Sequence, residues 1–162
     1  MPSAREPSQQ PERRASHGGE PRPRPSIGKI NRGVHSARCS ERPPVEVVRG
    51  FEQFNRGEFF EQHETLEDAW IAETDPIRYL YQGILQVGVG LLHLSRGNLY
   101  GADRLITRGL VLLETFRPTC MGVDVERFFQ QSSRCLEAIT QLTPGMIDTF
   151  DRTLIPQIEY SA

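Results

Sequence analysis

Residues 59–70 read Phe-Phe-Glu-Gln-His-Glu-Thr-Leu-Glu-Asp-Ala-Trp, a stretch that sets a histidine and several carboxylates among large apolar side chains. On a helix, residues three and four positions apart share a face. Because burying a polar group costs free energy unless it is paired, this stretch is either the surface-facing seam of a helical core or a binding site. It forms two neighbouring stripes, one of Phe59, His63, Leu66 and Trp70 and the other of Phe60, Glu64, Glu67 and Ile71.

Apolar residues recur at helical spacing on both sides of this stretch, and proline, glycine or asparagine separates the runs. Asp75, Asn98 and Asp124 stand where N-caps are expected. Residues 146–158 add a short helix or an apolar clasp, and we find no alternating strand pattern of useful length. The predicted fold class is all-α, a single multihelical bundle. Its five main helices are expected at about residues 44–55, 58–72, 76–96, 99–116 and 125–142.

The helix expected at 76–96 is the most apolar part of the chain and should be central. Gly83, Gly88 and Gly90 lie inside it, and each costs about 1 kcal/mol relative to alanine in a helix interior. Close approach of a neighbouring helix or of a bulky ring would compensate for this cost. We therefore expect these glycines to mark helix contacts.

The chain of 162 residues is long enough for one domain with a core. Residues 1–43 hold 7 of its 12 prolines and 9 Lys and Arg against 4 Asp and Glu. Such a composition buries too little apolar surface to offset the entropy of ordering. We predict a disordered basic tail at 1–43 and a helical domain at 44–160. The tail has some features of an organelle transit peptide, but its glutamates at 6, 12 and 20 argue against that.

The remainder of the chain is acidic, with 10 Lys and Arg against 17 Asp and Glu. This balance argues against a nucleic-acid-binding surface, which needs clustered cations. No apolar run approaches the roughly 18 to 20 residues needed to cross a bilayer, so no membrane association is expected. Cys39, Cys120 and Cys135 are odd in number and widely spaced, which favours a reducing compartment and no structural zinc. We expect a soluble, cytoplasmic protein.

A short turn joins the helices at 58–72 and 76–96, so they should pack as an antiparallel hairpin. The register of that hairpin sets Glu67 near Gln82 and His63 near Gln86. Together with Glu64, these residues define what we call the polar seam. His93 lies one heptad beyond Gln86, about 10 Å along the axis, and joins His63 only around a ligand or metal seated between them.

Three interpretations of the polar seam remain open at this stage. A paired polar network would fix helix register. Alternatively, His63, Glu67 and His93 would bind a divalent metal, since imidazole and carboxylate suit Zn, Mn, Fe or Ni. The motif His-Glu-x-x-Glu is not the zincin motif, because Glu67 replaces the second histidine. Thirdly, Glu67 beside His63 would act as an acid/base pair. Whether the protein is an enzyme is left open.

Several linked motifs resemble the DUF309 family of small bacterial and plastid proteins. They run Phe54-Asn-x-Gly-Glu58-Phe-Phe-Glu-x-His63-Glu-x-Leu-Glu67-x-x-Trp70, then Gln82-Gly-x-x-Gln86, His93 and Gly97-Asn98-x-x-Gly101-Ala102. The resemblance is clearest over about residues 45–115, and it leaves plastid targeting open beside the cytoplasmic expectation. It implies an all-helical bundle and a domain of unknown function, with no catalytic or ligand residue to carry over.

Two functions follow from the sequence. In the first, the polar seam is a site for a small ligand or a divalent metal. In the second, the protein is a non-enzymatic interaction or scaffold module, in which the seam is structural and an apolar helix face forms a homodimer. The expected partners are a small molecule or a protein, not nucleic acid or a membrane. The candidate ligand-binding residues are His63, Glu64, Glu67, Gln82, Gln86 and His93.

Overall fold

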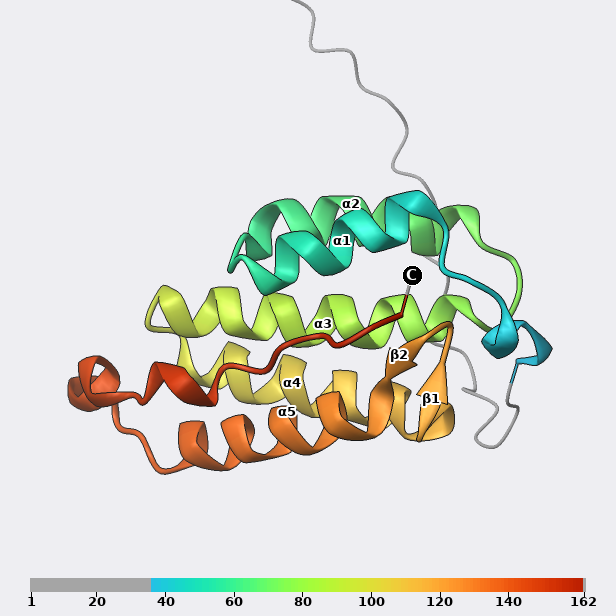
Figure 1. Cartoon of the computed structure of the whole chain (residues 1–162). Helices are drawn as coiled ribbons and strands as arrows, with labels where there is room; N and C mark the ends of the chain where they lie inside the picture. The colour runs from blue at the N-terminus through green and yellow to red at the C-terminus, as the bar shows by residue number, and fades with distance from the viewer. Residues whose placement is uncertain (1–35, 162) are drawn as a thin grey trace, which may run out of the picture.

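A computed structural model describes residues 36–161, most of which form α-helices (Figure 1). The predicted all-α class is confirmed, and the predicted helix ends are right to within about three residues. In the described part of the chain the α-helices are α1 (Val45–Asn55), α2 (Phe59–Ala72), α3 (Arg78–Ser95), α4 (Leu99–Leu113) and α5 (Val125–Thr140).

Side-chain caps fix where two of these helices begin, as predicted for Asn98 and Asp124. The Asn98 Oδ1 atom accepts a hydrogen bond of 2.8 Å from the Gly101 N–H, and Asp124 Oδ1 accepts one of 2.9 Å from the Arg127 N–H. Asp75 was predicted to cap the next helix but instead lies in the turn before it, where its Oδ1 accepts from the Ile77 N–H at 2.9 Å, and α3 starts at Arg78. Each cap satisfies a donor that the first helical turn leaves unpaired.

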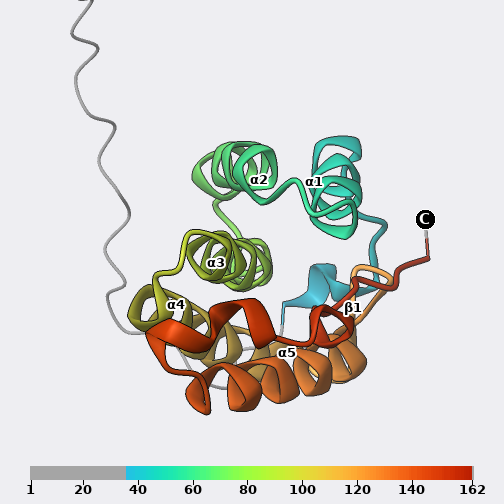
Figure 2. The same ribbon diagram turned by 90° about the vertical axis from the view of Figure 1, so that its left-hand side faces the viewer.

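Helix α3 lies in the middle of the molecule, between the layer of α1 and α2 and the layer of α4 and α5 (Figure 2). All residues from Leu80 to Gly88 are buried. A Cβ atom built on Gly83 or Gly90 would stand 2.8 Å from Leu113 or 2.6 Å from Ile106, both on α4. A Cβ atom on Gly88 would overlap the Gln62 side chain of α2. The expectation that these glycines mark helix contacts is confirmed.

Short elements complete the fold around the helices. The strands are only two residues long, below the length at which an alternating pattern can be recognised. An isolated bridge joins Val123 to Tyr160, so the C-terminal segment runs back across the molecule (Figure 1). The Asn55 side chain holds this segment by bonding both the N–H and the C=O of Ile158. The elements are the 3-10 helices η1 (Ala37–Ser40), η2 (Glu114–Phe116), η3 (Pro144–Thr149) and η4 (Arg152–Leu154), and the strands β1 (Thr119–Cys120) and β2 (Val123–Asp124).

The range predicted for the tail, 1–43, is too long at its C-terminal end. Residues 1–35 lie outside the described part of the chain, but residues 36–43 are placed against the helices. The Ser36 hydroxyl donates to Asp75 at 2.6 Å, and the Arg38 guanidinium donates to Glu73 at 2.7 Å. These partners are more than 30 positions away, so composition could not reveal them.

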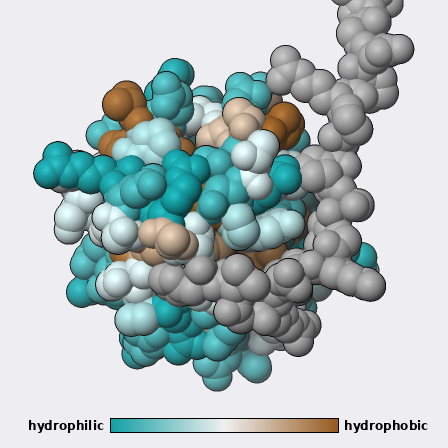
Figure 3. All heavy atoms as spheres, turned by 90° about the vertical axis from the view of Figure 1, so that its right-hand side faces the viewer, coloured by the Kyte–Doolittle hydropathy of each residue, from teal (hydrophilic) through white to brown (hydrophobic). Residues whose placement is uncertain are grey.

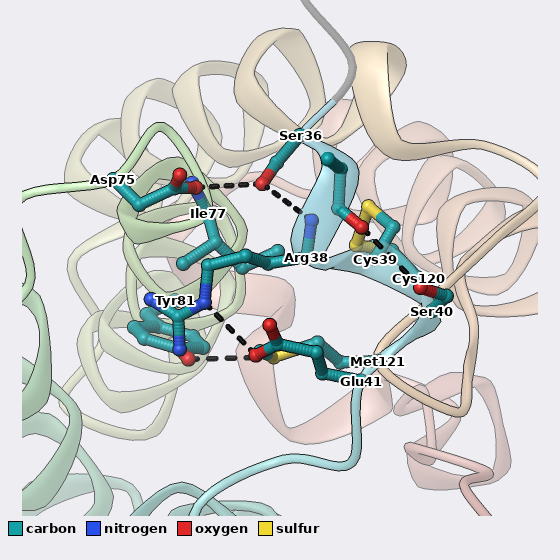
Figure 4. The surroundings of a disulfide bond; sticks show 11 residues. Ser36, Arg38, Cys39, Ser40, Glu41, Asp75, Ile77, Tyr81, Cys120 and Met121 are labelled. Carbon is teal, nitrogen blue, oxygen red and sulfur yellow. Dashed lines mark hydrogen bonds and ion pairs between the residues drawn. A yellow bond between two sulfur atoms is a disulfide. The ribbon is translucent and has the colours of Figure 1, made fainter.

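The structure also links two of the cysteines, which the sequence analysis did not expect. Cys39 and Cys120 form a disulfide across 81 residues (Figure 4). Cys135 is free and buried in the core. The cysteine spacing did not indicate this bond, because spacing along the chain does not report which residues meet in space. Among the described helices, none has the length and apolar character needed to cross a membrane.

Candidate functional site

The polar seam is divided between the core and the surface. Gln82 and Gln86 on α3 are only 3% and 9% exposed, and the Oε1 atom of each is buried without a hydrogen-bond partner. His63 and Glu67 lie on the half-exposed side of α2, where His63 Nε2 stands 3.5 Å from Glu67 Oε2. The four-residue contact predicted between His63 and Glu67 is therefore present, and it lies where water can reach it.

His93 occupies a different position, in the last turn of α3. Its Nδ1 atom lies 3.1 Å from Nδ2 of Asn98, the residue that caps α4. Within residues 36–161, no three His, Cys, Asp or Glu side chains stand close enough together to hold a metal ion. The predicted metal set of His63, Glu67 and His93 is thus not assembled.

A buried glutamine that the sequence argument passed over occupies the contact between α2 and α3. Gln62 is 0% exposed, faces Gly88, and has neither its amide oxygen nor its nitrogen paired. The predicted hairpin register is correct, since Gln62 meets Gly88 and the Arg78 guanidinium lies 5.5 Å from the Trp70 ring centre. The signal available in the sequence was Gly88 itself, because a helix glycine needs a neighbour that fills its space.

A groove with a volume of about 540 Å³ lies between α1 and α2. We call it the α1–α2 groove. Val47, Ala69 and Ala72 give it apolar walls, and Tyr81 of α3 also lines it. Glu64 is the one predicted site residue that lies there. The groove's charged residues are the acids Glu46, Glu64, Asp68 and Glu73 and the single cation Arg49.

The ionisation of two groove residues is set by their surroundings. Burial would raise the pKa of Glu73, but the backbone N–H of Asp75 and the Arg38 guanidinium donate to its carboxylate and bring the pKa below its usual value. Burial raises the pKa of Tyr81 to about 12. Its hydroxyl donates to Met121 Sδ at 3.3 Å. At neutral pH the groove therefore presents Glu73 as an anion and Tyr81 as a neutral phenol.

The groove could not be predicted from the register of α2 and α3, because that register does not say how α1 packs against α2. One signal was available. Glu64 and Asp68 are four residues apart on one helix, and like charges at that spacing repel each other. Both side chains are exposed on the side of α2 that faces α1. A repulsion of this kind is relieved when a cation lies between the two carboxylates.

Two smaller hollows lie elsewhere. Between α4 and α5, an apolar hollow of about 510 Å³ includes Leu110, Phe129 and the 44% exposed side chain of Val111. A third, of about 220 Å³, lies between α3 and the C-terminal 3-10 helices. Neither hollow contains any of the six predicted site residues.

Residues 47–105 match the family model described as "Domain of unknown function (DUF309)". Over this stretch the chain is similar to the DUF309 family. The suspected resemblance is thereby confirmed over a somewhat shorter range than expected. No curated protein and no solved structure matches the chain. The DUF309 segment spans α1 to the first half of α4, so it includes most of the α1–α2 groove. Both disulfide cysteines lie outside it, one on each side.

Proposed function

We propose that this protein is a non-enzymatic binding module whose α1–α2 groove holds a cationic peptide segment of a protein partner. The observation that carries the proposal is the groove itself, in which four carboxylates and one guanidinium line a hollow of about 540 Å³. That size lies within the range of roughly 300 to 1,000 Å³ that is usual for binding pockets.

The groove suits the two parts of a lysine or arginine side chain. The methylene stem packs on apolar surface while the charged end stays near carboxylates, and Val47, Ala69 and Ala72 supply that surface beneath the acids. Clefts lined by one sign of charge also concentrate the field and attract the opposite charge. A peptide with alternating cationic and small apolar residues would make both kinds of contact along the groove.

The residues around the groove favour binding over catalysis. The described side chains that line it include no cysteine, serine or histidine, which are the usual nucleophiles and bases. Tyr81, with a pKa of about 12, stays protonated at neutral pH and is a poor base. The groove therefore has charge and shape to offer a ligand.

The small-ligand hypothesis for the polar seam has less support. Gln82 and Gln86 are almost wholly buried, so a ligand would have to displace core side chains to reach them. His63 and Glu67 already lie within 3.5 Å of each other. This arrangement favours the alternative function predicted from the sequence, in which the seam is part of the helical framework and binding takes place elsewhere.

The proposal is tested with a fluorescein-labelled peptide of alternating lysine and alanine, by fluorescence anisotropy at low ionic strength. The double variant Glu64→Gln/Asp68→Asn should bind it roughly 2- to 30-fold more weakly, as expected for the loss of two exposed ion pairs. Glu61→Gln is the matched control, because Glu61 is exposed on the same helix outside the groove. The control should bind as the wild type does.

Salt provides a second measurement on the same samples. Raising the ionic strength from 0.1 M to 1 M shortens the Debye length from about 10 Å to about 3 Å, so affinity should fall for the wild type and fall less for the double variant. Equal affinity of the double variant, the control and the wild type would overturn the proposal. So would equally tight binding of a peptide with glutamate in place of lysine.

A further inference from the structure

The disulfide lies at the end of the molecule where η1 meets β1, and that end is mainly hydrophilic at its surface (Figure 3). Cys39 follows Arg38 in η1. Cys120 is the last residue of β1 and comes directly before Met121. A second link runs beside the bond, because the Met121 N–H donates to the Cys39 carbonyl at 2.7 Å. The bond thus joins two segments that are 81 positions apart in the chain.

The neighbour of Cys39 contacts one groove residue. Arg38 Nη1 donates to Glu73 at 2.7 Å, while Arg38 Nε donates to Glu41 at 2.9 Å. Glu73 lines the α1–α2 groove. The segment held by Cys39 therefore places a guanidinium on one of the four groove carboxylates, and this guanidinium competes with any cation that enters.

The neighbour of Cys120 contacts another groove residue. Met121 is buried and accepts the hydroxyl hydrogen of Tyr81 at its sulfur, 3.3 Å away (Figure 4). Tyr81 lines the α1–α2 groove. Met121 also has a φ of 50°, in the left-handed region that non-glycine residues seldom adopt. The disulfide at Cys120 and the hydrogen bond from the Met121 N–H to Cys39 hold this backbone in place.

We propose that the Cys39–Cys120 bond is a reversible thiol–disulfide exchange site and that its reduction raises the affinity of the α1–α2 groove for cationic peptides. The second half of this proposal rests on the proposed function. When the bond is intact, Arg38 neutralises Glu73. When the bond is reduced, η1 is held by non-covalent contacts alone, Arg38 leaves Glu73 more readily, and the groove gains a free carboxylate.

The reductant is a dithiol. One of its thiolates attacks Cys39 Sγ, since Cys39 is half-buried whereas Cys120 is only 1% exposed. A mixed disulfide forms at Cys39, and the electron pair of the broken bond leaves on Cys120 Sγ, which takes up a proton. The second thiol of the reductant then displaces Cys39 as a thiol and closes the reductant's own disulfide. Two electrons and two protons pass to the protein. Cys135 takes no part, because it is buried away from solvent.

The exchange is tested first on the full chain, by counting thiols. Oxidised protein is incubated natively with dithiothreitol or without it, quenched, unfolded, labelled with maleimide and weighed by mass spectrometry. Wild type should carry one label without dithiothreitol and three labels with it. Cys135→Ser should carry no label without dithiothreitol and two labels with it. Three labels in protein purified under oxidising conditions, or reduction only after unfolding, would overturn the exchange site.

The regulation is tested by the affinity for the lysine–alanine peptide in each redox state. Reduced wild type should bind roughly two- to fivefold more tightly than oxidised wild type, the size expected when one partly buried surface ion pair no longer competes. Arg38→Ala should reach the same affinity while oxidised and change little on reduction. Arg56→Ala is the matched control, since Arg56 pairs with Glu58 outside the groove, and should keep the redox effect.

The outcomes separate the two proposals. Equal or weaker binding by reduced protein, with the Glu64 and Asp68 dependence intact, would overturn the regulation and leave the proposed function standing. Failure of both redox states to bind the peptide would overturn the proposed function and the regulation that rests on it. In either case, thiol counting alone decides whether the Cys39–Cys120 bond undergoes exchange.

Discussion

At the scale of single residues, Tyr81 connects the groove to the pH dependence of stability. Its pKa is about 12 in the folded protein, against about 10 for tyrosine in an unfolded chain. Because the folded value is the higher one, this contribution to stability is fully present below pH 10 and is lost as the pH rises toward 12. We expect the melting temperature of the wild type to fall across that window.

Tyr81→Phe should lose part of this alkaline dependence, since it has no hydroxyl to ionise. Melting temperatures measured by circular dichroism between pH 8 and pH 12 give the comparison, and absorbance near 295 nm follows the ionisation directly. Tyr100→Phe is the control, because Tyr100 is 73% exposed. A Tyr81→Phe curve parallel to that of the wild type would contradict this assignment.

At the scale of helices, the contact between α2 and α3 depends on Gly88 having no side chain. Alanine is the better helix former by about 1 kcal/mol, but a Cβ at this position would overlap the Gln62 amide and stand 3.3 Å from a Phe54 ring carbon. Overpacking of a core costs about 1 to 3 kcal/mol. We therefore expect Gly88→Ala to lower the free energy of unfolding, as measured by urea denaturation.

Gly145→Ala provides the comparison for Gly88→Ala. Nothing lies within 4 Å of a Cβ built on Gly145, so its replacement should leave the urea midpoint nearly unchanged. The double variant Gly88→Ala/Gln62→Ala should recover part of the loss, because it removes the side chain that is overlapped. A Gly88→Ala protein as stable as the wild type would show that Gln62 moves aside at little cost.

The register of this hairpin could be predicted because a short turn leaves two helices few ways to pack. The same reasoning set Glu67 near Gln82 and His63 near Gln86. This reasoning could not decide how deeply each of these side chains is buried. A register says which residues are level with one another, whereas the rotation of α2 about its axis buries Gln62 and leaves His63 near the surface. That rotation is set by Leu66 and Trp70, which are both buried, and only the assembled core fixes it.

At the scale of the whole molecule, the unpredicted features all join segments far apart in the chain. Asn55 holds Ile158, Ser36 bonds Asp75, and Cys39 is linked to Cys120. Local patterns of apolar and polar residues contain no information about such pairs. The helices were therefore predictable from periodicity and caps, while the groove wall at Glu73 and the ends of the domain were not.

The disulfide should also stabilise the fold as a whole, apart from any effect on the groove. Its two cysteines are 81 positions apart, and by the chain-entropy model a link closing a loop of this size restricts the unfolded chain by about 4 to 5 kcal/mol. Reduced wild type should accordingly unfold at a lower urea concentration than oxidised wild type. Cys39→Ser/Cys120→Ser should match the reduced protein and show no response to dithiothreitol, whereas Cys135→Ser should keep the full response. If the double variant were as stable as oxidised wild type, the corner between η1 and β1 would be held by Arg38, Ser36 and the Met121 amide alone, and reduction would release nothing.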